Sequence, residues 1–244
     1  MEQEVVEGGE VRALIDVLLQ QGVVSMTDKE LKQHVQHALD WEPSIDAIDI
    51  GVSVDEGIVT LRGNVGSYIE KVSAERVALR VYGVKGVADD LIVRLVSGYE
   101  RTDTEIAQAA VAELKWNTVV PADRVTVTVA NGRVTLDGTL DYYYQSATAE
   151  RAVRGLTGVK GVSNSIVLQA PTASIRTSGV AAKIEAAFRW SAEIDARRIN
   201  VTAQDGKVIL SGNVHSWAER REAERAAWAA PGVTQVDDRL AVVP

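Results

Sequence analysis

GIVTLRGNV at Gly57–Val65 returns as GRVTLDGTL at Gly132–Leu140 and as GKVILSGNV at Gly206–Val214. In each stretch a second Gly stands six positions after the first. The copies are offset by 75 and 74 residues, and three tryptophans, Trp41, Trp116 and Trp190, show the same two offsets. A fixed period of this kind is typical of tandem structural repeats. We therefore expect three copies of one small module.

A tight turn precedes each of the three repeated stretches. Asn131-Gly132 and Asp205-Gly206 favour a two-residue hairpin, since both central residues of a type I′ turn need positive φ, and Glu56-Gly57 is a weaker relative. Apolar residues alternate just before the first turn, from Ile48 to Val54, which indicates a half-buried strand. The repeated stretch is thus predicted to return antiparallel to it. Six glycines are expected to be structural, at the turns and at the strand ends, where Gly relieves strain or admits a close neighbour: Gly57, Gly63, Gly132, Gly138, Gly206 and Gly212.

Helices are predicted on both sides of the hairpin. Thr27-Asp28-Lys29-Glu30 and Thr102-Asp103-Thr104-Glu105 favour a capped first helix, and Thr177-Ser178 is a weaker version. A second helix is expected over about Ser67 to Tyr82, Tyr142 to Leu156 and Ser216 to Ala230, followed by a strand such as Val84 to Val96. The order is α-β-β-α-β. The predicted fold class is α+β: three tandem modules, each a three-stranded mixed sheet packed by two helices.

The predicted boundaries are 27–97, 101–171 and 174–244, with short linkers between them. Residues 1–26 match nothing in the repeat. They are either an extra helix, with Val11, Leu14, Ile15 and Leu18 on one face, or an extension upstream of an alternative start at Met26. Both interpretations stay open.

The order of elements, the strand-end Gly, the Ala-Glu-Arg of the second helix (Ala74-Glu75-Arg76 in the first copy) and the closing Gly-Val-x-x-Val (Gly83 to Val87) together resemble the BON domain. That family is named for bacterial osmotically inducible and nodulation proteins. The resemblance covers residues 27 to 243 and implies a non-enzymatic protein linked to osmotic stress or envelope integrity, with phospholipid as a ligand in several members. One cytoplasmic relative pairs the module with a peptidoglycan-type domain and binds potassium.

Composition restricts the function. The chain has no Cys and three His, and it carries no phosphate loop, nucleophile elbow or His-based metal motif, so we expect no enzyme, no metal site and no cofactor. A net charge of −8 disfavours nucleic-acid binding. The acidic start, Met1-Glu2-Gln3-Glu4, lacks the basic region of a secretory signal, and the apolar stretch from Val11 to Leu19 is too short to span a membrane. The protein is expected in the cytoplasm.

Three further residue groups recur or cluster in ways that could mark a site. His34 and His37 lie three apart on a helix but lack a third ligand, so they are interpreted as surface residues. The recurring Glu75-Arg76, Glu150-Arg151 and Glu224-Arg225 fit salt bridges better than an ion-binding groove. The repeated tryptophans Trp41, Trp116 and Trp190 end the first helix of each copy and are expected to anchor it on the sheet.

The second helices differ between copies. The third module is the only one with more basic than acidic residues, ten against nine. Its second helix carries Trp217, Arg220, Arg221, Arg225 and Trp228, and the start of the second module's helix carries Tyr142, Tyr143 and Tyr144. An aromatic and basic helix face suits anionic head groups or a membrane interface. Packing against a neighbouring module is the other interpretation.

The predicted function is a non-catalytic, stress-associated binding protein that recognises phospholipid surfaces or envelope-associated partners. Two alternatives remain: sensing of potassium or another small ligand, for which the acidic first module is suggestive, and a protein-interaction scaffold.

Overall fold

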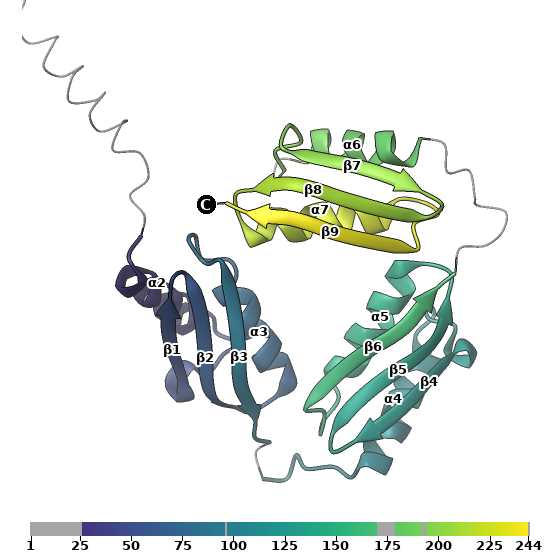
Figure 1. Ribbon diagram of the computed structural model, residues 1–244. Coiled ribbons are helices and arrows are strands. Elements are labelled where there is room, and N and C mark those ends of the chain that lie inside the picture. Colours follow the sequence, from purple (N-terminus) through teal and green to yellow (C-terminus); the bar gives the residue numbers. More distant parts are fainter. Residues whose placement is uncertain (1–25, 96, 170–178, 192–193, 244) are drawn as a thin grey trace, which may run out of the picture.

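The computed structural model describes residues 26–95, 97–169, 179–191 and 194–243, and it confirms three α+β modules with the predicted order of elements (Figure 1). The first helices are α2 (Asp28–Trp41), α4 (Asp103–Trp116) and α6 (Val180–Trp190). The second helices are α3 (Tyr68–Ala78), α5 (Tyr143–Arg154) and α7 (Trp217–Ala229). The strands are β1 (Ile50–Asp55), β2 (Ile58–Val65), β3 (Gly86–Val93), β4 (Val125–Ala130), β5 (Arg133–Leu140), β6 (Gly161–Leu168), β7 (Ile199–Gln204), β8 (Lys207–Val214) and β9 (Gln235–Val242).

Each sheet is mixed, as predicted. The repeated stretch forms the central strand, which pairs antiparallel with the strand before it and parallel with the last strand of the module. At the turns Glu56, Asn131 and Asp205 have φ of 48°, 53° and 49°, and the glycine that follows each is also in the left-handed region. This is the pair of positive φ angles that a type I′ turn requires.

The first helix is fastened to the hairpin. Thr27 and Glu30 form a capping box, as do Thr102 and Glu105. One residue later, the Asp28 carboxylate accepts from the backbone N–H of Glu56 at 2.9 Å and of Gly57 at 3.0 Å. Asp103 does the same in the second module, at 2.8 Å to each turn N–H. The predicted weaker cap at Thr177-Ser178 lies outside the described residues, and α6 begins after Gly179.

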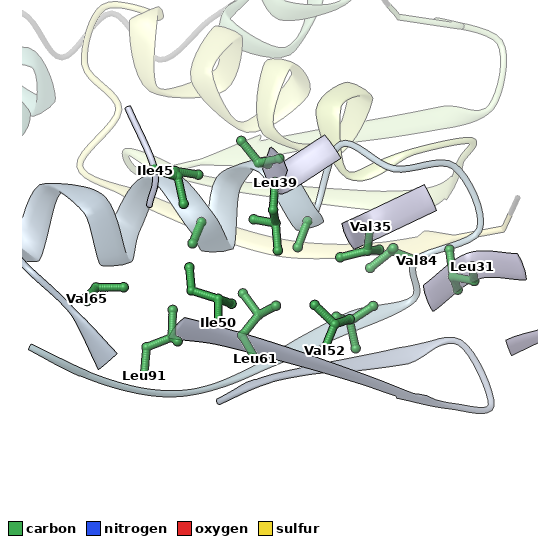
Figure 2. Packing of buried hydrophobic residues seen from close by; sticks show 14 of the residues in the cluster. Leu31, Val35, Leu39, Ile45, Ile50, Val52, Leu61, Val65, Val84 and Leu91 are labelled. Atoms are coloured by element: carbon green, nitrogen blue, oxygen red, sulfur yellow. The ribbon is translucent and has the colours of Figure 1, made fainter. Parts of the chain in front are cut away.

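Both helices of a module cover one face of its sheet. Figure 2 shows the first core, where Leu31, Val35 and Leu39 of α2 pack on apolar side chains of the strands such as Leu61. The second and third modules have cores of their own. Each module therefore satisfies its main hydrophobic requirement alone.

Two expectations about the first helices and the first strand were wrong. Trp41, Trp116 and Trp190 do not anchor helices on the sheets: their exposed fractions are 84%, 86% and 86%. The α2 residues that face the core are four positions apart, at 31, 35 and 39, so a residue at 41 falls on another side of the helix. Ile48 precedes the strand and is 90% exposed, because a short 3₁₀ turn occupies residues 47–49.

The second helix of the first module ends at Ala78 rather than near Tyr82. The N–H groups of Arg80 and Val81 bond to the carbonyls three residues before them, at 3.1 and 3.2 Å. This is the hydrogen-bond pattern of a 3₁₀ turn, so the α-helix ends before these residues. The turn that follows leads into β3.

The modules lie around a triangle, with β3, β6 and β9 toward its middle (Figure 1). In this view the three sheets lie in front and the helices behind them. Each module is turned relative to the previous one in the same sense, so the arrangement has approximate three-fold symmetry. Equivalent residues of the modules therefore lie on the same side of the ring.

A glycine substitution tests the close backbone contact at Gly63, where the pairing of the central strand with the first strand ends. A Cβ at Gly63, where φ is 132°, would lie 1.8 Å from the Asp49 carbonyl oxygen. We expect Gly63→Ala to lower the free energy of unfolding by about 3 kcal/mol, from backbone strain and the clash together. Urea unfolding followed by circular dichroism measures it.

Gly86→Ala is the matched control, since a Cβ at Gly86 meets nothing within 4 Å. Its effect should stay within about 0.5 kcal/mol. Equal losses in both variants would contradict the assigned contact.

Candidate functional site

A pocket of about 520 Å³ lies between the second and third modules. Five of the eight predicted binding residues line it: Tyr142, Tyr143, Tyr144, Arg225 and Trp228. The Tyr143 and Trp228 rings stack across the junction, with centroids 4.5 Å apart and planes 12° apart. Tyr142 and Tyr144 stack on each other at 5.5 Å. The second helices of two modules thus combine their aromatic residues in one place.

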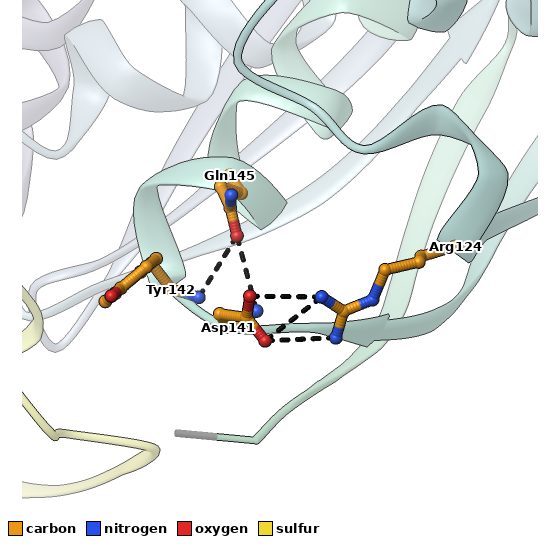
Figure 3. Close-up of polar contacts among 4 residues, drawn as sticks. All are labelled: Arg124, Asp141, Tyr142 and Gln145. Atoms are coloured by element: carbon orange, nitrogen blue, oxygen red, sulfur yellow. Dashed lines mark hydrogen bonds and ion pairs between the residues drawn. The ribbon is translucent and has the colours of Figure 1, made fainter. Parts of the chain in front are cut away.

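Polar contacts fix the start of α5 and with it the three tyrosines (Figure 3). The side-chain oxygen of Gln145 accepts from the N–H of Asp141 at 3.3 Å and of Tyr142 at 3.2 Å. The Arg124 guanidinium holds the Asp141 carboxylate through both of its oxygens, at 3.0 to 3.1 Å. The same contact raises the pKa of Arg124, because the ion pair favours the charged form. Arg124 precedes β4, so the sheet positions the helix that carries the aromatic wall.

In the other two modules a glutamate at the position of Gln145 accepts hydrogen bonds from backbone N–H groups near the start of the second helix. Glu70 accepts from the N–H groups of Asp46 and Gly66, each at 2.7 Å. Glu219, which is 5% exposed, accepts from Asp195 at 2.8 Å and His215 at 2.6 Å. The contact is therefore a shared device of the scaffold.

Two arginines stand at the pocket. Arg151 lines it and is exposed, and within the described residues it has neither an ion pair nor a hydrogen bond. Arg225 also lines it and pairs with Glu222 at 2.5 Å, although 74% of its side chain is exposed. The pocket thus joins an aromatic wall to a guanidinium that is available to an anion.

The pKa of Tyr143 is raised. Burial is the main cause, because it disfavours the phenolate, and the negative charges of Glu224 and Glu150 act in the same direction, while Arg151 opposes them. Tyr143 therefore stays a neutral phenol in its stack on Trp228.

An equivalent junction joins the first and second modules. Tyr68, which corresponds to Tyr143 in the repeat, packs against the cores of both modules. Ile69 lies against Gly155, and a pocket of about 380 Å³ opens beside them. Sequence reasoning singled out neither Ile69 nor this pocket. The alignment of Tyr68 with Tyr143 and Trp217 was the available signal, and packing against a neighbouring module was one of the two interpretations of these helix starts. For Tyr68 the structure agrees with that interpretation.

Trp217, Arg220 and Arg221 do not line the pocket, so the third module's predicted aromatic-basic face is divided. Arg220 binds Asp238 at 2.7 Å and lies over the Trp217 ring at 4.8 Å. The pKa of Arg221 is lowered by burial, and then by the charges of Arg80 and Arg76 of the first module. These residues stand at repeat positions that form the other two junctions, so the second helix of the third module lies near that of the first, as the ring in Figure 1 indicates.

The exposed tryptophans form a second candidate surface. Trp41, Trp116 and Trp190 all end first helices, and they are as exposed as each other. Large exposed apolar side chains at three equivalent positions are not explained by the cores. Sequence reasoning assigned these three residues to packing, and their exposure makes them a candidate surface instead.

The two histidines and the recurring Glu-Arg pairs form no binding site within the described residues. His34 and His37 are exposed on α2, and within the described ranges no group of three or more His, Asp or Glu is arranged to hold a metal ion. Glu150 bonds to Arg154 and Asn164 rather than to Arg151. The recurring Glu-Arg neighbours therefore form no common groove in the part of the chain that the structure describes.

Fold and site together define a tandem α+β repeat protein whose junctions carry aromatic residues. The chain belongs to the BON domain family, whose model matches residues 27–94, 102–170 and 177–244. This confirms the resemblance that the repeats suggested.

The chain is similar to osmotically-inducible protein Y of Escherichia coli (strain K12), with 36% identity over 146 residues, which cover 58% of this chain and 72% of the relative. Among solved structures, two of CdsD, a structural protein of the type III secretion system of Chlamydia trachomatis, align over 88% of this chain and over 98% and 93% of their own. Both have 16% identity and a TM-score of 0.25, which is too low for a functional inference.

A double-mutant cycle tests the junction stack. Tyr143→Ala and Trp228→Ala should each destabilise the chain, and their coupling energy should be about 1 kcal/mol, the usual value for a stacked aromatic pair. Urea unfolding of the four proteins of the cycle measures it. Strictly additive effects would mean that the rings are not in contact in solution.

The raised pKa of Tyr143 predicts a pH effect. Its folded-state pKa lies above the ordinary value of 10.0, so its contribution to stability is complete below pH 10 and is lost as pH rises through the folded-state pKa. The difference in stability between the chain and Tyr143→Phe, measured by urea unfolding at several pH values, should therefore change above pH 10. A difference that stays constant would contradict the shift.

Proposed function

We propose that this chain is a non-catalytic, stress-associated protein that binds phospholipid surfaces through Trp41, Trp116 and Trp190. The supporting observation is that these three side chains, at equivalent repeat positions, are 84%, 86% and 86% exposed. The family assignment and the relative named for osmotic induction support the link to stress.

The chemistry of indole favours such a surface. Tryptophan has a large apolar ring and one N–H donor, and it concentrates at the boundary between lipid and water, where both can be satisfied. A soluble chain gains nothing from three such rings in water. At a lipid surface, by contrast, the three indole rings would leave water.

The ring supports simultaneous contact. The three tryptophans end helices that lie on one side of the ring, opposite the sheets (Figure 1). Because the modules are related by approximate three-fold rotation, the three ends lie at similar heights along the axis. One flat surface can then receive all three, and three weak insertions act together.

A net charge of −8 argues for insertion rather than for strong electrostatic attraction. In the described part of the chain, no helix is long and apolar enough to cross a membrane. The proposed mode is contact with the lipid interface. The cytoplasm is the proposed compartment, and fractionation of cells that make the tagged chain would test it.

Flotation with phospholipid vesicles tests the proposal. We expect the chain to float with the vesicles and the variant Trp41→Ala/Trp116→Ala/Trp190→Ala to bind about a hundredfold more weakly, if each indole contributes about 1 kcal/mol at the interface. The variant should keep its stability, since exposed side chains contribute little to it.

The matched control replaces three exposed apolar residues of the sheets, Ile58, Ile92 and Val167, with Ala. It should float like the unmodified chain. Equal losses in the two triple variants would show that surface hydrophobicity in general is responsible, and no flotation of the unmodified chain would refute the proposal.

A further inference from the structure

We propose that the pocket between the second and third modules binds one single-chain amphiphile with an anionic head, of the kind represented by a free fatty acid. This site is distinct from the tryptophan surface and serves one detached molecule rather than a bilayer.

The wall of the pocket is suited to a hydrocarbon chain. Two stacked aromatic pairs line it, Tyr142 with Tyr144 and Tyr143 with Trp228. Small residues, including Ala147 and Ala229, line the rest and leave the space open. A volume of about 520 Å³ lies within the range of small-molecule sites in proteins.

The rim of the pocket is suited to an anion. Arg151 has no partner among the described residues, so its guanidinium can bind a carboxylate through two parallel hydrogen bonds. The second rim arginine, Arg225, already pairs with Glu222 and therefore offers no free guanidinium. One free guanidinium beside one apolar wall fits one head group and one chain.

The equivalent pocket between the first and second modules provides an internal comparison. It too contains an aromatic residue of the second helix, Tyr68, and an arginine, Arg154. That arginine is paired with Glu150, however, and the position equivalent to Arg151 is Arg76, which does not line this pocket. An available cation at the pocket therefore distinguishes the second junction, and we expect a single site per chain.

Calorimetric titration of the full chain with decanoate, kept below its micelle concentration, tests the proposal. We expect saturable binding with one site per chain. Arg151→Gln should weaken it about tenfold, through loss of a charged hydrogen-bonded pair. Arg133→Gln is the matched control, because Arg133 is an exposed arginine in the central strand of the same module, and it should bind like the unmodified chain.

Two further titrations separate the head from the chain. Acetate, which has the head alone, should not bind measurably, and octyl glucoside, which has a chain and a neutral head, should bind at least about tenfold more weakly than decanoate. Ala147→Trp should abolish decanoate binding by filling the pocket, and a thermal melt checks that this variant is folded.

The outcomes are decisive in both directions. Absence of saturable decanoate binding, equal affinity in Arg151→Gln, or equal affinity for octyl glucoside would overturn the proposal. The variant without Trp41, Trp116 and Trp190 should bind decanoate normally while failing to float with vesicles. The pocket and the membrane surface can therefore fail independently of each other.

Discussion

The fold of each module depends on a backbone contact that only glycine permits. At Gly63, Gly138 and Gly212 the chain passes so close to the carbonyl oxygen of the residue before the first strand that a Cβ would lie 1.8 to 2.1 Å from it. This contact brings the end of the central strand against the beginning of its antiparallel neighbour. The parallel third strand and both helices then assemble on that pair, so the rest of the module follows from it.

A second constraint comes from module size. A unit of about 70 residues buries a small core, and further stability comes from its neighbours. At two junctions the start of one second helix meets the end of the second helix in the next module, and the second helix of the third module lies near that of the first. The ring creates what no single module has: stacked rings from two helices beside Arg151, whose guanidinium has no ion pair or hydrogen bond within the part of the chain that the structure describes. The pocket is therefore a property of the junction.

The repeated residues serve two purposes. Turn residues and strand-end glycines recur because every copy must fold in the same way, and their φ angles and close contacts account for them. Trp41, Trp116 and Trp190 recur just as regularly, yet no core includes them. Recurrence within the chain thus marks a shared surface as well as a shared scaffold. Residues that differ between the modules determine which junction has an aromatic stack with an available arginine beside it.

The sequence by itself determined the modules, their order of elements and the mixed sheet, because turn propensity, strand alternation and helix caps act over short distances. It also identified eight aromatic and basic residues of the second helices as candidates, of which five line the pocket. Only the tertiary structure decided that these residues meet across a junction, that Arg220 is held by Asp238, and that the three helix-end tryptophans face water. Local patterns define which elements form, but the rotation of a helix on its sheet and the docking of one module on another depend on contacts between residues far apart in the chain.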